Sequence, residues 1–138
     1  MSLHCLIYTS IASQKMTDED LKAILQKARP HNCQLHITGM LLYKDPFFMQ
    51  ILEGEEDIIH QQFTKIAKDP RHHKISLIYK KAIHERTFTN WTMGFNKISS
   101  QHIKYADNLK TLYDRSFFTE ESKVVENLLK MFENETLF

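Results

Sequence analysis

Residues 37–54 have the sequence ITGMLLYKDPFFMQILEG, in which two apolar runs flank the polar turn Lys44-Asp45-Pro46. Apolar runs bounded by Gly and Pro are typical of a β-hairpin. Because alternate residues of a strand share a face, Gln50 is expected on the same face as Phe48 and Leu52, where it would be buried. An unpaired buried amide costs about 1–3 kcal/mol, so Gln50 needs a hydrogen-bond partner, either a protein group or a ligand.

The segments that flank this hairpin predict further strands and helices. Apolar residues recur with a period of two in the strands and at intervals of three and four residues in the helices. Thr17 is a suitable N-cap for the first helix, and Pro30 is expected to end it. The order β-α-β-β-α-β-β predicts an α+β, ferredoxin-like sheet with two helices on one face. The expected elements are strands over 3–9, 74–83 and 90–96 and helices over 18–29 and 55–68.

The C-terminal residues predict a tail of two more helices. One apolar stripe lies near 100–113, and another follows the N-cap candidate Thr119, with apolar positions from 124 to 132. We therefore divide the chain into a domain over 1–96 and a helical extension over 97–138 that is not an independent domain. The stripes must be buried against the free face of the sheet, each other or a second subunit. A homo-oligomer, a dimer or higher, is expected.

The composition argues against several classes of function. The chain has 138 residues, which suits one domain, and its 18 basic and 17 acidic residues leave no electrostatic footprint for nucleic acid or an anionic membrane. No apolar run is long enough for a transmembrane helix. The N-terminus lacks a signal-peptide pattern, and Cys5 and Cys33 form no CxxC, so a cytoplasmic location is expected. The eight histidines lack metal-ligand spacing, and no metal is expected.

Motifs for enzymatic chemistry are weak. Ser10 is not surrounded by GxSxG, and Cys33 has histidines near it only in sequence. An acyl-phosphate hydrolase on the same scaffold needs a glycine-rich or basic first loop, whereas residues 11–15 contain no glycine and one lysine. We therefore expect that the chain is not an enzyme.

Three polar residues are expected to converge between the two helices and the sheet. Tyr8 and Gln50 lie on strands that are neighbours in this topology, and Asn32 follows the first helix at the same edge of the layer. A hydroxyl and two amides in that position can surround a planar, polar heterocycle. The alternative is a hydrogen-bond network within the protein, because a buried glutamine is usually satisfied internally.

An ordered set of short motifs over residues 1–96 resembles the BLUF family, the blue-light sensors that use FAD. Each motif alone is weak, but the set in this order is highly specific. The tail is similar to that of the short BLUF photoreceptors, which have no fused output domain. The motifs are Leu6-Ile7-Tyr8-x-Ser10, Asn32, Ile37-Thr38-Gly39-Met40-Leu41, Phe48 to Gly54, Asp69-Pro70-Arg71-His72-His73 and Phe88-x-x-Trp91-x-Met93.

The resemblance implies that FAD is bound non-covalently between the two helices. It makes Tyr8 the donor of an electron and a proton to the excited flavin, Gln50 the bridge between Tyr8 and the flavin, and Asn32 the amide that fixes the carbonyl edge of the ring. Trp91 and Met93 match the pair whose exchange of place is proposed as the signal. The other residues that it places at the cofactor are Ile24, His31, Phe48, Lys65, Ile66, Arg71 and His72, with Lys65 near the phosphates.

The function implied by the resemblance is that of a blue-light photoreceptor. Light would rearrange the hydrogen bonds among Tyr8, Gln50 and the flavin, and the last strand would relay the change to the C-terminal helices and a downstream signalling protein. The alternative is a light-insensitive protein-interaction module of the same fold. Nothing in the sequence favours that alternative, because Tyr8, Gln50 and Asn32 are all present.

Overall fold

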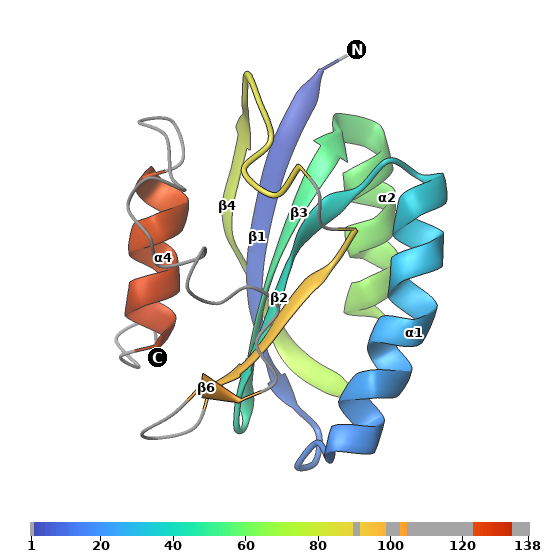
Figure 1. Ribbon diagram of the computed structural model, residues 1–138, viewed down its shortest axis with the longest axis vertical. Coiled ribbons are helices and arrows are strands. Elements are labelled where there is room, and N and C mark those ends of the chain that lie inside the picture. The colour runs from blue at the N-terminus through green and yellow to red at the C-terminus, as the bar shows by residue number, and fades with distance from the viewer. Residues whose placement is uncertain (1, 90–91, 99–102, 105–122, 134–138) are drawn as a thin grey trace.

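The computed structural model describes residues 2–89, 92–98, 103–104 and 123–133. Figure 1 shows the elements along the chain. They are β1 (Leu3–Ala12), α1 (Asp18–Gln34), β2 (Thr38–Lys44), β3 (Phe47–Glu55), α2 (Glu56–Ala67), β4 (His72–Ala82), β5 (Gly94–Ile98), β6 (Ile103–Lys104) and α4 (Lys123–Glu133).

The strands form one six-stranded sheet in the order β4-β1-β3-β2-β5-β6. β1 is antiparallel to both β3 and β4, β2 is antiparallel to β3, and β5 runs parallel to β2. Helices α1 and α2 cover one face of this sheet and α4 covers the other (Figure 1). The α+β, ferredoxin-like fold expected from the sequence is therefore confirmed.

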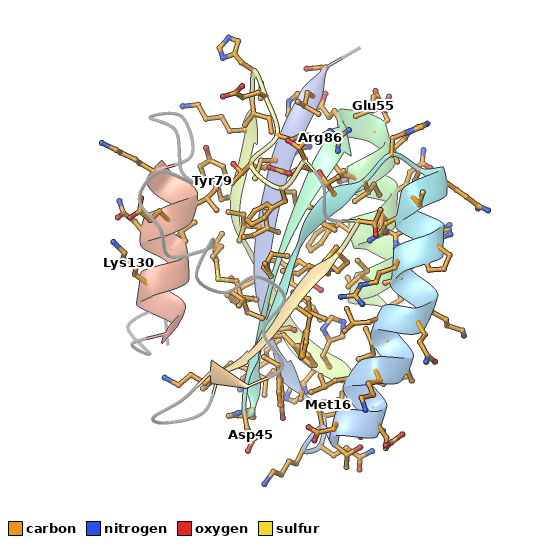
Figure 2. The ribbon with its side chains drawn as sticks, in the orientation of Figure 1. Met16, Asp45, Glu55, Tyr79, Arg86 and Lys130 are labelled. Atoms are coloured by element: carbon orange, nitrogen blue, oxygen red, sulfur yellow. The ribbon has the colours of Figure 1, made fainter. Side chains whose placement is uncertain are left out.

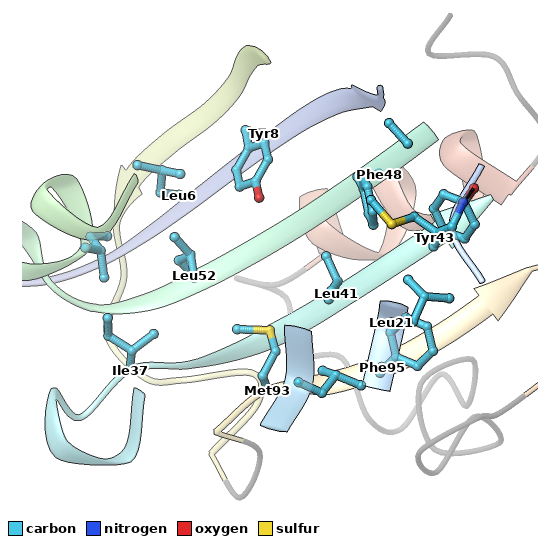
Figure 3. Close-up of a cluster of buried hydrophobic side chains, with 14 residues drawn as sticks. Leu6, Tyr8, Leu21, Ile37, Leu41, Tyr43, Phe48, Leu52, Met93 and Phe95 are labelled. Carbon is cyan, nitrogen blue, oxygen red and sulfur yellow. Dashed lines mark hydrogen bonds between the residues drawn. The ribbon is translucent and has the colours of Figure 1, made fainter. Parts of the chain in front are cut away.

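Each face of the sheet carries its own apolar core. Leu6, Leu41 and Leu52 belong to the cluster between the sheet and the first two helices (Figure 3). Ile7 and Ile51, which are adjacent in sequence to Leu6 and Leu52, belong to the cluster that includes Val125 of α4. Because successive residues of a strand point to opposite faces, burial on both sides explains why the central strands are almost continuously apolar.

The expected hairpin is formed by β2 and β3. Gly39 lies opposite Leu52, and a Cβ atom at Gly39 would come within 1.9 Å of the Ile51 carbonyl oxygen, so only glycine fits at this crossing. At the turn, the Tyr43 hydroxyl donates to Asp45 Oδ1 over 2.6 Å and accepts from the backbone N–H of Met16 over 3.1 Å. Figure 2 shows Met16 and Asp45 at this end of the molecule. The hairpin turn is thereby joined to the loop that precedes α1.

The first helix starts as predicted but ends later. Thr17 and Asp20 form a reciprocal capping box, with bonds of 3.1 Å and 2.9 Å. The expectation that Pro30 ends the helix was wrong, because α1 continues to Gln34. A proline removes one backbone hydrogen bond, but the turn that follows is fixed by tertiary contacts. The buried Asn32 lies in that turn, and its side chain donates to the Thr92 carbonyl over 2.9 Å.

The last expected strand begins later than predicted. Thr92 and Met93 form a bend, and β5 starts at Gly94 rather than at residue 90. The carbonyls of Thr92 and Met93 accept hydrogen bonds from side chains of α1, which attach this bend to the helix. Trp91 lies outside the described residues.

The tail differs from the expected pair of helices. Within the expected helix near 100–113, Ile103 and Lys104 form strand β6, which pairs with β5, and the remaining residues lie outside those described. The last expected helix is present as α4, and its Val125 is only 4 % exposed. Tyr79 of β4 packs against the same core (Figure 2). Of the three places expected for the apolar stripes, α4 uses the free face of the sheet.

Two absences concern only the described part of the chain. None of its helices has the length and apolar character needed to cross a membrane. No group of three or more His, Cys, Asp and Glu side chains within it is arranged to hold a metal ion.

Candidate functional site

A cavity of about 420 Å³ lies between α1, α2 and the face of the sheet that these helices cover. Its volume is within the range typical of small-molecule sites. The ten residues that the family resemblance places at a cofactor all line it. They are Tyr8, Ile24, His31, Asn32, Phe48, Gln50, Lys65, Ile66, Arg71 and His72.

Tyr8 and Gln50 meet on the sheet wall of this cavity. They are direct partners in the antiparallel register of β1 and β3. The Tyr8 hydroxyl donates to Gln50 Oε1 over 2.5 Å, and both side chains are buried. Burial raises the pKa of Tyr8, and the nearby Asp69 charge raises it further. Tyr8 is therefore a neutral phenol, and its proton is directed at the amide oxygen of Gln50.

The amide nitrogen of Gln50 has a weaker partner. Gln50 Nε2 lies 3.5 Å from the Met93 sulfur, and a thioether is a poor hydrogen-bond acceptor. Met93 is 1 % exposed, so this contact is made in the core rather than at the surface. Gln50 thus contacts Tyr8 through its amide oxygen and Met93, the residue before β5, through its amide nitrogen.

Asn32 places a second amide at the cavity. Its Nδ2 atom donates to the Thr92 carbonyl over 2.9 Å, while its Oδ1 atom has no hydrogen-bond partner among the described residues. Asn32 is 1 % exposed, and a buried acceptor without a partner is costly. The side chain therefore presents an acceptor that a bound molecule can satisfy.

His72 closes the side of the cavity near β4. Its Nε2 atom lies 2.6 Å from the Ile66 carbonyl oxygen and its Nδ1 atom 2.7 Å from the Ser10 hydroxyl. A carbonyl only accepts, so Nε2 carries a proton, and in the neutral ring Nδ1 accepts from Ser10. The ring also meets Tyr8 and Phe48 edge-on, with centroid separations of 6.1 Å and 6.4 Å. His72 is consequently held in one orientation beside the phenol.

Three of the lining residues are lysine or arginine, and they come from the two helices and from the turn that precedes β4. Arg71 pairs with Asp69, and this guanidinium lowers the pKa of the Asp69 carboxyl. Lys27 of α1 and Lys65 of α2 have no ion-pair partner in the described part of the chain. Two of the three cations therefore remain available to an anionic ligand.

The cavity also contains residues that the sequence analysis missed. Several follow from helical spacing, because Ala28 lies four residues after Ile24 and Gln62 lies four before Ile66. Arg29 lies outside this lining, and its Nε donates to the Met93 carbonyl over 2.9 Å. No pattern in the sequence indicated this contact, since the two residues are 64 apart in the chain. The further lining residues are Met16, Lys27, Ala28, Leu41, Gln62 and Asp69.

Comparison with known proteins defines the class to which this site belongs. The sequence model of the BLUF family, described as sensors of blue-light using FAD, matches residues 3–94. The chain belongs to the BLUF family. BLUF domains are sensor modules rather than enzymes, and residues 3–94 form such a module.

Curated relatives share the same domain. The photoactivated adenylate cyclase subunit beta of Euglena longa is 40 % identical over 93 residues, which are 67 % of this chain and 11 % of that protein. The blue light- and temperature-regulated antirepressor BluF of Escherichia coli strain K12 is 33 % identical over 73 residues, 53 % of this chain and 18 % of that one. The chain thus spans about a tenth of the length of the cyclase subunit.

Solved structures similar to the chain include proteins of nearly the same length. The BLUF protein BlrB in its dark state has a TM-score of 0.70 and 28 % identity, and the match covers 97 % of each chain. BlsA in its ground state has a TM-score of 0.69 and 31 % identity, with 96 % of this chain and 86 % of that one covered. The likeness to these two structures therefore extends beyond the residues that the family model matches.

Proposed function

We propose that the chain is a blue-light photoreceptor that binds FAD non-covalently in the cavity between α1 and α2 and responds to light by rearranging the hydrogen bonds of Gln50. The observation that carries this proposal is the 2.5 Å hydrogen bond from the Tyr8 hydroxyl to Gln50 Oε1 on the cavity wall. This bond supports the proposal because it joins a buried phenol, which could give up an electron and a proton, to an amide that could rotate.

The chemistry of the lining residues fits a flavin. The edge of a flavin ring carries both N–H donors and carbonyl or ring-nitrogen acceptors. Asn32 Oδ1 is a buried acceptor without a described partner, and Gln50 Nε2 is a donor with only a thioether beside it. Lys27, Lys65 and Arg71 supply the positive charge that a diphosphate needs. On this basis FAD, rather than a shorter flavin, is the proposed cofactor.

When bound, the flavin supplies the absorption of blue light and an excited state that accepts an electron and a proton. Tyr8 is neutral at rest because burial raises its pKa. Loss of an electron makes the phenol proton strongly acidic, and Gln50 Oε1 is the atom that receives it. When electron and proton return, the Gln50 amide remains rotated or tautomerised. In the net reaction the protein neither gains nor loses an electron or a proton, but its hydrogen-bond donors and acceptors are rearranged.

The proposed output runs through Met93. A rotated Gln50 amide no longer presents Nε2 to the Met93 sulfur, so the side chain of Met93 loses its weak contact. Met93 directly precedes β5, which pairs with β2 and with β6. A displaced Met93 therefore shifts β5 and the C-terminal residues that follow. The proposed reader is a downstream signalling protein, and self-association through the tail and a cytoplasmic location remain predictions.

The absorption spectrum of the purified protein tests the proposal. We expect a yellow protein whose flavin bands move to longer wavelength under blue light and return in the dark. Mass spectrometry of the released cofactor should give FAD. A protein that remains colourless after incubation with FAD would overturn the proposal, whereas a yellow protein without a light-induced shift would favour the light-insensitive interaction module.

Hydrogen exchange tests the relay separately. Dark and illuminated samples should differ in amide protection within residues 94–132, because the proposed signal reaches β5 and the tail. Identical profiles together with a normal spectral shift would limit the response to the cavity and contradict the relay.

A further inference from the structure

The last turns of α1 bind two consecutive carbonyl groups just before β5. Asn32 Nδ2 donates to the Thr92 carbonyl and Arg29 Nε to the Met93 carbonyl, both over 2.9 Å. The two donors are three residues apart, so they lie on the same face of the helix. The carbonyl of Met93 is consequently attached to α1.

This attachment determines where the Met93 sulfur lies. A methionine side chain has three rotatable bonds and selects no position by itself. Its backbone is held by Arg29, its side chain is buried, and its sulfur lies 3.5 Å from Gln50 Nε2. A continuous series of contacts thus runs from Arg29 through Met93 to Gln50 and Tyr8.

We propose that Arg29 is a positioning residue of the photoreceptor, which holds Met93 against the amide of Gln50 and so sets the energy difference between the two amide orientations. This inference rests on the proposed light response. Arg29 does not line the cavity, whereas Asn32 does. The guanidinium therefore acts through Met93 and not through contact with the cofactor.

The direction of the effect follows from the contacts. With Oε1 toward Tyr8, Gln50 directs Nε2 at the sulfur, and this weak bond favours the resting orientation. Without Arg29 the Met93 carbonyl loses a charge-assisted hydrogen bond, and the sulfur is no longer held at Nε2. The resting orientation then loses part of its advantage, and the return from the illuminated state is slower.

Arg29→Met tests this inference, with Lys22→Met as the matched control. Lys22 is an exposed cation of α1 outside the cavity lining. At equal flavin occupancy, Arg29→Met should slow dark recovery by roughly threefold or more, a size usual for coupled contacting groups, while Lys22→Met should recover at the wild-type rate. Arg29→Lys, which keeps a charged donor, should restore most of the rate. Recovery by Arg29→Met within experimental error of the wild type would overturn the inference.

A double-mutant cycle separates positioning from a purely structural role. In a Met93→Ala background there is no sulfur to position, so Arg29→Met should then leave the recovery rate unchanged. An equal slowing with and without Met93 would overturn the inference. A wild-type protein that shows no photocycle would instead contradict the proposed function, and the two failures are thereby distinguished.

Discussion

Tyr8 on β1 and Gln50 on β3 are direct cross-strand partners, and the phenol hydroxyl donates to Gln50 Oε1 over 2.5 Å. Their meeting depends on the register of the sheet, because a slip of one residue would turn Gln50 to the opposite face. That face belongs to the core under α4, where Met49 and Ile51 lie. The geometry of the pair is therefore a property of the paired strands rather than of a flexible loop.

Tyr8→Phe should keep the flavin and abolish the light-induced spectral shift. The ring still packs against Phe63, which lies 5.4 Å away between centroids, but the donor of the proton is lost. Absorption before and after blue illumination gives the answer. Tyr43→Phe is the matched control, because Tyr43 bonds Asp45 at the hairpin turn and does not line the cavity. A normal shift in Tyr8→Phe would remove Tyr8 from the mechanism.

Gln50→Leu should also bind flavin without a photocycle. Leucine has nearly the volume of glutamine but neither donates nor accepts, so the Tyr8 hydroxyl loses its acceptor. The same illumination assay applies, together with flavin fluorescence to measure occupancy. Gln61→Leu, at an exposed position of α2, should behave like the wild type. If Gln50→Leu cycled normally, the amide would not be the switch.

Lys65→Met should weaken binding of FAD but not of riboflavin, which has no phosphate. Lys65 lines the cavity, and an exposed cation contributes about 0.2–1 kcal/mol to an ion pair, or roughly 1.4-fold to fivefold in Kd. Titration of the flavin-free protein by fluorescence quenching measures both ligands. The difference should shrink at high salt because exposed charges are screened. An equal loss of affinity for FAD and riboflavin would show that Lys65 does not contact the phosphates.

Gly39→Ala should destabilise the fold strongly, by about 3 kcal/mol. The new Cβ would lie 1.9 Å from the Ile51 carbonyl oxygen, and neither strand can move without breaking the β2–β3 register. Gly54→Ala provides the comparison, since its Cβ meets the Ile59 Cγ2 atom, on a side chain, at 3.0 Å. In urea unfolding, the free energy of unfolding of Gly39→Ala should be well below that of Gly54→Ala.

Glu53 carries a buried carboxylate that the hairpin pattern did not single out. It is 1 % exposed, and it accepts from the Thr38 hydroxyl over 2.9 Å and from the backbone N–H groups of Thr87 and Phe88 over 2.7 Å and 3.0 Å. Arg86 donates to the Glu53 backbone carbonyl over 2.9 Å, and Figure 2 shows its position. This network ties the segment after β4 to the centre of the sheet.

Glu53→Gln should lower stability at neutral pH by about 1–3 kcal/mol, because an amide nitrogen would face a backbone N–H. Burial raises the pKa of Glu53, although its hydrogen bonds oppose the change. Between this raised pKa and the ordinary value of 4.5, the folded state binds more protons than the unfolded state, so stability rises as pH falls. The stability gap between wild type and Glu53→Gln should therefore widen on acidification toward pH 4.5 in urea unfolding. A gap that narrows would contradict the raised pKa.

Residues close together in the chain account for most of what could be predicted. The alternation over 37–54 and the helical stripes depend only on neighbours, and they predicted the hairpin, α1, α2 and α4 to within a few residues, except where α1 continues past Pro30. The ordered set of family motifs indicated Tyr8, Asn32 and Gln50, and all three residues line the same cavity. Such a local pattern predicts helices and strands because backbone geometry sets their periods.

The remaining features depend on residues that are distant in the chain. Arg29 and Met93 are 64 residues apart, and no local pattern links a guanidinium on a helix to a carbonyl before a strand. The same holds for the Glu53 network and for the extension of α1 past Pro30, where tertiary hydrogen bonds outweigh local propensity. Periodicity therefore specified the sheet and its helices. Only packing between distant segments brought Met93 to Gln50, because a contact between distant side chains depends on the tertiary structure and not on their spacing in the sequence.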